Sequence, residues 1–244
     1  MDLESIENLL REKKFYEAFN EIDKILMENE NLKEDIKEIM ETVANEFFEE
    51  GDNDSAKKIF EKEISIDPYS GYLNCGLIEL DNDNNDKAIS NFMKALEYKE
   101  TDEAYRYLGM AYSNKEDYSN AIKFLTIAVQ KDDNFENNHQ LGLAYLGAEK
   151  YEKAIEHLTK ALNFNENYET LHYLGMAYMG IDEYGKAIDL FTKSINLNEN
   201  FADAYYYRGM CYYALQDEIK ANMDYKKAVE LNPDYENMPY ESYT

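Results

Sequence analysis

A period of 33 residues runs through most of this chain. The hexapeptide Tyr-Leu-Gly-Met-Ala-Tyr occurs at 107–112 and again at 173–178, and a related stretch begins midway, at Gln140. Glycines keep nearly the same spacing, and each is followed twelve residues later by an alanine; they are Gly76, Gly109, Gly142, Gly175 and Gly209. Self-similarity at a fixed period of this length predicts an array of repeated structural units.

Each unit is predicted to be a helix hairpin. Two amphipathic segments surround every glycine–alanine pair, and a short polar stretch such as 114–117 or 180–183 separates them. Glycine inside a helix costs about 1 kcal/mol relative to alanine, so it is tolerated where two helices must approach closely. We therefore expect each glycine to face the second helix of its own hairpin.

These units resemble the tetratricopeptide repeat, a 34-residue helix–turn–helix unit. One unit carries the pattern at Tyr105, Leu108, Gly109, Tyr112, Tyr118, Ala121, Leu125 and Ala128, and the last carries it at Tyr205, Gly209, Tyr212, Ala221, Tyr225, Ala228 and Pro233. Two departures stand out: Arg208 replaces the leucine before the last glycine, and most linkers are one residue short. The resemblance implies an all-α fold, a right-handed α-solenoid of about six to seven antiparallel hairpins.

The resemblance also implies how the chain is divided. Five clear repeats cover about 69–235, and a weaker one at 37–68 completes a tandem array over 37–235. Residues 1–36 are interpreted as a degenerate repeat or a cap, and 236–244 as a short tail. In the last unit Glu218 and Asn222 replace the tyrosine and isoleucine of earlier units. Because a terminal repeat needs a polar outer face, this change predicts a C-terminal cap.

Charge and cysteine content narrow the function classes. The formal net charge is −26, with 25 basic against 51 acidic residues and no basic run, which disfavours a nucleic-acid partner. No segment approaches the length and apolarity of a membrane span, and the first residues are acidic where a signal peptide is basic. Two cysteines fit a reducing compartment, so we expect a cytoplasmic protein.

Patterns of catalysis and of cofactor binding are absent from the sequence. No serine or cysteine sits near a histidine in a nucleophile motif, and no glycine-rich phosphate loop occurs. His139 and His172 hold matching places in adjacent units, but stacked helices place them too far apart for one metal. We expect no enzyme, no cofactor and no metal site.

The resemblance implies a continuous concave groove along the first helices. The flank of each first helix that points away from its own partner would line it, and that flank is mostly apolar. The predicted groove residues are Leu73, Leu77, Arg106, Tyr107, Met110, His139, Leu143, Leu146, His172, Tyr173, Met176, Met179, Tyr206, Tyr207, Met210 and Tyr213. For any one of them, packing against a neighbouring unit is an equal alternative.

One acidic residue per unit runs beside this stripe: Glu103, Glu136, Glu169 and Asp203. Acids in the first turn also offset the helix dipole without any ligand. As a rim, they predict a protein or peptide partner that is apolar or amphipathic and carries basic residues. The alternative is a self-associating oligomer, in which another copy covers the groove or an end of the array.

Overall fold

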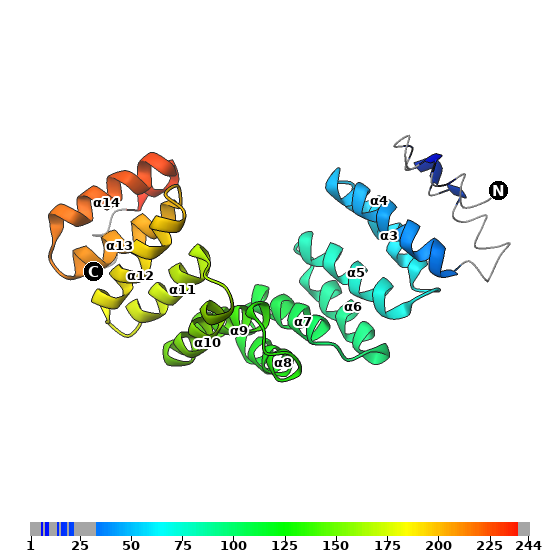
Figure 1. Cartoon of the computed structure of the whole chain (residues 1–244), viewed down its shortest axis with the longest axis horizontal. Coiled ribbons are helices and arrows are strands. Elements are labelled where there is room, and N and C mark those ends of the chain that lie inside the picture. The colour runs from blue at the N-terminus through cyan, green and yellow to red at the C-terminus, as the bar shows by residue number, and fades with distance from the viewer. Residues whose placement is uncertain are drawn as a thin grey trace. The chain divides into compact units, whose positions relative to one another are not determined.

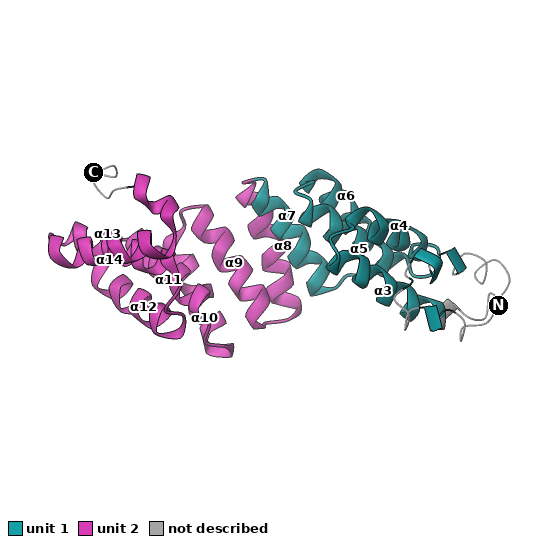
Figure 2. Ribbon diagram, turned by 90° about the horizontal axis from the view of Figure 1, so that it is seen from above, with its two compact units in different colours: residues 1–115 teal, residues 116–244 magenta. Residues whose placement is uncertain are grey.

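The structure is a computed structural model that describes residues 33–238 and, before them, only positions 6, 8, 9, 14, 16–18, 20 and 21. The described residues form helices and turns without a strand, which confirms the all-α class (Figure 1). They divide into two compact units, residues 1–115 and residues 116–244 (Figure 2). The border falls inside the predicted turn at 114–117.

Helices follow one another with short turns throughout both units. Unit 1 contains α3 (Lys33–Glu49), α4 (Asn53–Glu63), α5 (Pro68–Asp81), α6 (Asn85–Tyr98) and α7 (Asp102–Asn114). Unit 2 contains α8 (Tyr118–Lys131), α9 (Phe135–Gly147), α10 (Tyr151–Phe164), α11 (Tyr168–Met179), α12 (Tyr184–Leu197), α13 (Ala202–Ala214), α14 (Glu218–Leu231) and the 3-10 helix η2 (Pro233–Asn237).

Neighbouring helices pack as the predicted hairpins. In unit 1, α3 packs on α4 and α5 on α6; in unit 2, α9 packs on α10, α11 on α12 and α13 on α14. Each hairpin then packs on the next, through α4 on α5 and α6 on α7, and through α10 on α11 and α12 on α13. A core therefore continues from repeat to repeat within each unit, as expected for stacked repeats.

The repeat glycines lie where the two helices of a hairpin come closest. A Cβ added to Gly76 would lie 2.5 Å from the Phe92 ring, and one added to Gly175 would lie 2.7 Å from Phe191. At Gly142 the same atom would lie 2.6 Å from Leu158. These contacts are too short for a side chain, which confirms for these three glycines that they face the second helix of their own hairpin.

Left-handed residues close the turns between the first and second helices. Asp83, Glu116, Glu149, Asp182 and Gln216 have φ between 56° and 63°. This conformation turns the chain so that the next amide groups reach back to the end of the first helix. In one such turn the Lys150 amide donates to the Tyr145 carbonyl at 2.9 Å. Hairpins can therefore close within three or four residues.

Tyrosines at the start of second helices join successive repeats in unit 2. The Tyr118 ring lies against Gly147 and the Tyr151 ring against Gly180, both at the end of the following first helix. A larger residue than glycine would meet the ring there. Glu218 takes the tyrosine position in the repeat at 202–235, and it is exposed.

The predicted polar cap is wrong in part. Glu218 and Asn222 are exposed, as a cap requires. However, Ile219 and Met223 on the same helix are 78% and 67% exposed. Since residues four apart share one face of a helix, they form an apolar strip on the outer surface of α14.

The N-terminal region is described only at scattered positions. Ile6 and Ala18 are buried in the core that Met40 and Phe47 of α3 form with α4, and Leu9 packs against it. The sequence also has apolar residues at 15, 19, 22 and 26, where a second helix of this unit is predicted, and these positions lie outside the described residues. The division at residue 36 stays a prediction.

Candidate functional site

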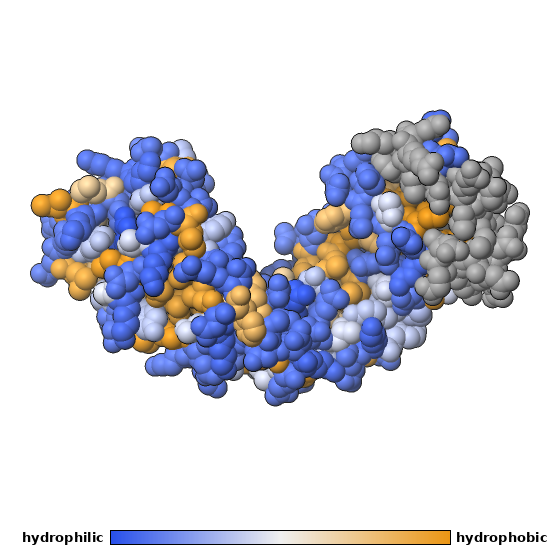
Figure 3. Space-filling view, in the orientation of Figure 1, coloured by the Kyte–Doolittle hydropathy of each residue, from blue (hydrophilic) through white to orange (hydrophobic). Residues whose placement is uncertain are grey.

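A cavity of about 620 Å³ opens between the first helices of unit 2. Figure 3 shows apolar surface on the face of this unit that is in view. The cavity is lined by Leu143, Leu146, Gly147, Glu149, Tyr151, Tyr173, Met176, Met179, Gly180 and Tyr207. Six of the predicted groove residues are thus brought together: Leu143, Leu146, Tyr173, Met176, Met179 and Tyr207.

The helical period explains why these residues meet. Leu143 and Leu146 are one turn apart on α9, and Met176 and Met179 hold the same places on α11. The equivalent faces of α9 and α11 therefore form adjoining walls. Tyr207, on α13, extends the lining into the next repeat.

Four lining residues were not among the predicted ones. Gly147 and Gly180 end first helices, while Glu149 and Tyr151 belong to the turn and the second helix that follow. The sequence did carry a signal for them, because Tyr118, Tyr151 and Tyr184 recur at 33-residue spacing. That pattern indicates a shared packing partner, which the structure identifies for two of them as glycine.

Three predicted groove residues are almost completely buried. Leu73, His172 and Tyr206 are 6%, 3% and 2% exposed, so their assignment to an open groove is wrong. His172 shows the reason, because its side chain faces the next repeat and not solvent. The His172 ring, for example, lies 5.1 Å from Phe201 and 5.2 Å from Tyr207, measured between ring centroids.

Burial favours the neutral form of the two predicted groove histidines. Burial lowers the pKa of His172 to about 4, and its Nδ1 has no hydrogen-bond partner. Burial also lowers the pKa of His139, whose Nδ1 lies 2.9 Å from the Thr170 hydroxyl. Neither ring is arranged to carry a charge near pH 7. Among the described residues, no group of three or more His, Cys, Asp or Glu side chains is placed to hold a metal ion.

The other predicted groove residues occur in both units. Leu77, Arg106, Tyr107 and Met110 belong to unit 1 and are half-buried, and the Arg106 guanidinium lies 4.6 Å from the centroid of the Tyr107 ring. Tyr107 also stacks on Phe92 of the preceding hairpin, at 5.8 Å. In unit 2, Met210 and Tyr213 are half-buried beside Tyr206.

The residues of the predicted acidic rim do not line the cavity of unit 2. Glu136 and Glu169 are exposed in the first turns of α9 and α11, whereas the lining of the cavity on these helices begins at Leu143 and Tyr173. At 1.5 Å per residue, about 10 Å of helix separates Glu136 from Leu143, and about 6 Å separates Glu169 from Tyr173. Asp203 accepts a hydrogen bond from Tyr235, and Glu103 belongs to unit 1. The acid that does line the cavity is Glu149.

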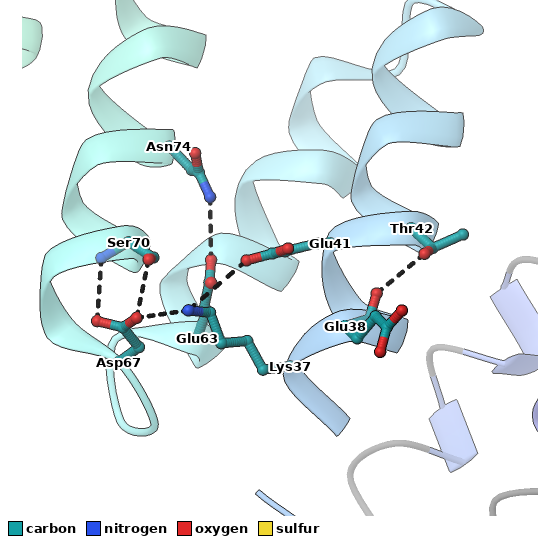
Figure 4. Close-up of polar contacts among 8 residues, drawn as sticks. All are labelled: Lys37, Glu38, Glu41, Thr42, Glu63, Asp67, Ser70 and Asn74. Carbon is teal, nitrogen blue, oxygen red and sulfur yellow. Dashed lines mark hydrogen bonds and ion pairs between the residues drawn. The ribbon is translucent and has the colours of Figure 1, made fainter. Parts of the chain in front are cut away.

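Unit 1 contains a polar cluster near the N-terminal ends of α3 and α5 (Figure 4). Lys37 donates to Asp67 at 2.6 Å and lies 3.8 Å from Glu41. Glu63 is completely buried between these helices; Asn74 donates to its Oε2 at 3.2 Å, and Oε1 has no hydrogen-bond partner. Burial raises the pKa of Glu63 to about 7.

Comparison with known proteins identifies the family. Sequence models of the tetratricopeptide repeat match residues 69–102, 135–168, 168–201 and 202–235, which together span more than half of the chain. The chain belongs to the tetratricopeptide-repeat family. The last repeat matched, 202–235, includes Arg208 and the first residues of η2. No curated protein sequence matches the chain significantly.

Solved tetratricopeptide-repeat structures resemble this one. YrrB, described as a protein with an unusual peptide-binding site, is 25% identical with a TM-score of 0.61, and the match covers 75% of this chain and 96% of YrrB. MamA is 26% identical with a TM-score of 0.60, covering 68% of this chain and 92% of MamA.

A third structure is similar in fold alone. In the Cut9–Hcn1 hetero-tetramer of the APC/C, one chain is 18% identical with a TM-score of 0.71, and the match covers 93% of this chain and 45% of that one.

In the described part of the present chain, every helix is too short or too polar to cross a lipid bilayer.

Proposed function

We propose that this tetratricopeptide-repeat protein is a non-catalytic interaction scaffold that holds a peptide or helix of another protein. The cavity of unit 2 is the observation that carries the proposal. Its volume of about 620 Å³ lies within the range of ligand pockets, about 300–1,000 Å³. The similarity to YrrB supports a peptide as the ligand, since the description of that protein includes a peptide-binding site.

The lining residues favour apolar side chains of varied shape. Met176 and Met179 form one wall, and methionine adapts to different partners because its side chain is unbranched and polarizable. Tyr173 and Tyr207 add flat aromatic surface with hydroxyl groups. The partner therefore inserts Leu, Ile, Met or aromatic side chains, which is the pattern of an amphipathic segment.

Charge favours a partner with basic residues. The chain has a net charge of −26, Glu149 lies at the cavity, and Glu136 and Glu169 are exposed on the same two repeats. Lys or Arg flanking the apolar anchors would be attracted, and this attraction would weaken as salt rises. The same charge disfavours nucleic acid and anionic membrane surfaces. The proposed location is the cytoplasm.

Selection from a random peptide library tests the proposal. Peptides selected on the intact chain are expected to carry apolar anchors and basic residues, and to bind the Met176→Glu variant at least about thirtyfold more weakly. Met93→Glu is the matched control, because Met93 is a half-exposed methionine of unit 1. Equal binding to the chain and to Met176→Glu would reject this cavity as the site.

Self-association is a second candidate, favoured by the apolar strip on α14. Ile219 and Met223 are the kind of exposed apolar pair that a second copy would cover. Sedimentation over a wide concentration range tests it. A mass that rises with concentration in the chain but not in the Ile219→Lys/Met223→Lys variant supports it, and a constant monomer mass excludes it.

A further inference from the structure

Residues 233–238 fold back onto the last repeat instead of extending away from it. The Tyr235 ring stacks on the Tyr206 ring of α13, with centroids 4.4 Å apart and an interplanar angle of 24°. Its hydroxyl donates to Asp203 at 2.7 Å. Burial, and then the hydrogen bond to Asp203, raise the pKa of this hydroxyl. The side chain is thus recognised by both its ring and its polar end.

Hydroxyl groups of the last repeat also hold the backbone of this segment. Tyr206 donates to the Met238 carbonyl at 3.1 Å. The Tyr225 hydroxyl, on α14, lies 3.1 Å from the Tyr235 carbonyl and 3.0 Å from that of Glu236. Bonds to carbonyl groups are available to any sequence of the same shape. Selectivity therefore rests on the tyrosine side chain at position 235.

The repeat pattern shows what this segment replaces. Phe201, at the start of α13, packs on His172 of α11 with ring centroids 5.1 Å apart. Tyr235 and Tyr206 each lie 34 residues further along the chain and make the equivalent contact. Residues 233–238 therefore occupy the place where the first turn of another repeat would pack on α13.

The segment leaves a cavity of about 290 Å³ between itself and α13. Met210 and Tyr207 line it together with Tyr206 and residues of the segment. Tyr207 also lines the larger cavity of unit 2. A ligand that extends from α9 and α11 toward α13 would meet the segment at this residue.

We propose that Asp203, Tyr206, Met210 and Tyr225 form a tyrosine-binding subsite that the chain's own residues 233–238 fill. A partner that reaches the last repeat then carries a tyrosine, placed on a turn with free carbonyl groups, and displaces this segment. The inference goes beyond the proposed function, because it concerns a different set of residues and does not require the larger cavity to bind anything.

Binding in trans tests the proposal directly. The protein is a chain ended after Asn232, which keeps all of α14, and the probe is a labelled peptide of residues 233–244 followed by fluorescence anisotropy. The peptide is expected to bind this shortened chain at least about tenfold more tightly than the full chain, whose subsite is occupied. A peptide with Tyr235→Ala is expected to bind at least about tenfold more weakly than the parent peptide. A peptide with Tyr235→Phe is expected to have an affinity between those of these two peptides.

Three results would overturn the proposal. They are equal affinity for the full and shortened chains, equal affinity of the Tyr235→Ala peptide, and no binding at peptide concentrations of about 1 mM, the effective concentration that a short linker provides. If circular dichroism shows that the shortened chain is not folded, the full chain with Tyr235→Ala takes its place. Met176→Glu in the shortened chain should leave the affinity unchanged, which separates this subsite from the larger cavity.

Discussion

Arg208 and Asp224 form a two-point ion pair between α13 and α14. Arg208 Nε donates to Asp224 Oδ2 and its Nη2 to Oδ1, both at 2.7 Å. Nη1 donates to the Thr192 hydroxyl of the preceding hairpin at 3.1 Å. Arg208 stands where the repeat pattern has leucine, so the departure seen in the sequence is matched by a carboxylate on the facing helix.

Removing only one partner of this pair should destabilise the protein strongly. Asp224 is 7% exposed, and Asp224→Ala leaves the Arg208 guanidinium without its carboxylate. We expect a loss of about 3–5 kcal/mol in the free energy of unfolding, measured by urea denaturation. The double variant Arg208→Leu/Asp224→Leu should lie within about 1 kcal/mol of the parent, because both charges are gone. Additive losses in the double variant would contradict this account.

Two glycines of the same hairpin should respond oppositely to alanine. Gly175→Ala places a Cβ 2.7 Å from Phe191, so the hairpin must open, and we expect a loss of about 1–3 kcal/mol. Gly185 lies in α12 with no atom within 4 Å of an added Cβ. There alanine should stabilise by about 0.5 kcal/mol through helix propensity. Thermal unfolding of the two variants measures the difference, and losses of equal size would refute close approach at Gly175.

His172 should make the protein less stable in acid. Its pKa is lowered from 6.5 to about 4 by burial, so the folded protein favours the neutral ring. The resulting stabilisation is complete above pH 6.5 and is lost as the pH falls toward 4. Relative to His172→Phe, the parent should lose on the order of 2 kcal/mol between pH 7 and pH 4.5. If the free energy of unfolding changed with pH in the same way in the parent and in His172→Phe, a lowered pKa of His172 would be contradicted.

Glu63 should act in the opposite direction. Burial raises its pKa from 4.5 to about 7, while the hydrogen bond from Asn74 opposes the shift. The stabilisation is complete below pH 4.5 and is lost as the pH rises through 7. Glu63→Gln keeps the shape without the charge, and it should be more stable than the parent by about 2 kcal/mol at pH 8 and no more stable at pH 4. Chemical denaturation of the parent and of Glu63→Gln at pH 8 and at pH 4 measures this difference in the free energy of unfolding. A constant difference would contradict a titrating Glu63.

Periodicity predicted the hairpins and much of the cavity, because both depend on residues that recur at the same helical position. Gly175 had to face its own second helix, and Met176 had to point away from it. The same reasoning misplaced His172 and Tyr206, since the pattern of a single helix does not tell whether a flank meets solvent or the next repeat.

The end of the array was harder to predict from the sequence. The sequence predicts a tail at 236–244, yet the carbonyl groups of Glu236 and Met238 accept hydrogen bonds from the last repeat, and 239–244 lie outside the described residues. The sequence does contain a sign that a helical turn begins here. Pro233 precedes Asp234 and Tyr235 much as Pro68 precedes Tyr69 at the start of α5. The ion pair of Arg208 was invisible in the sequence, since Asp224 departs from the pattern on a different helix.

Methyl NMR of methionine-labelled protein tests the proposed binding surface most directly. On titration with a library-selected peptide, the Met176 and Met179 signals should shift in proportion to occupancy. The signals of Met93 and Met223, which are exposed outside the cavity, should stay in place. Raising the salt concentration should weaken the same titration. Shifts confined to Met93 or Met223, with Met176 and Met179 unchanged at saturation, would contradict a peptide site in the cavity of unit 2.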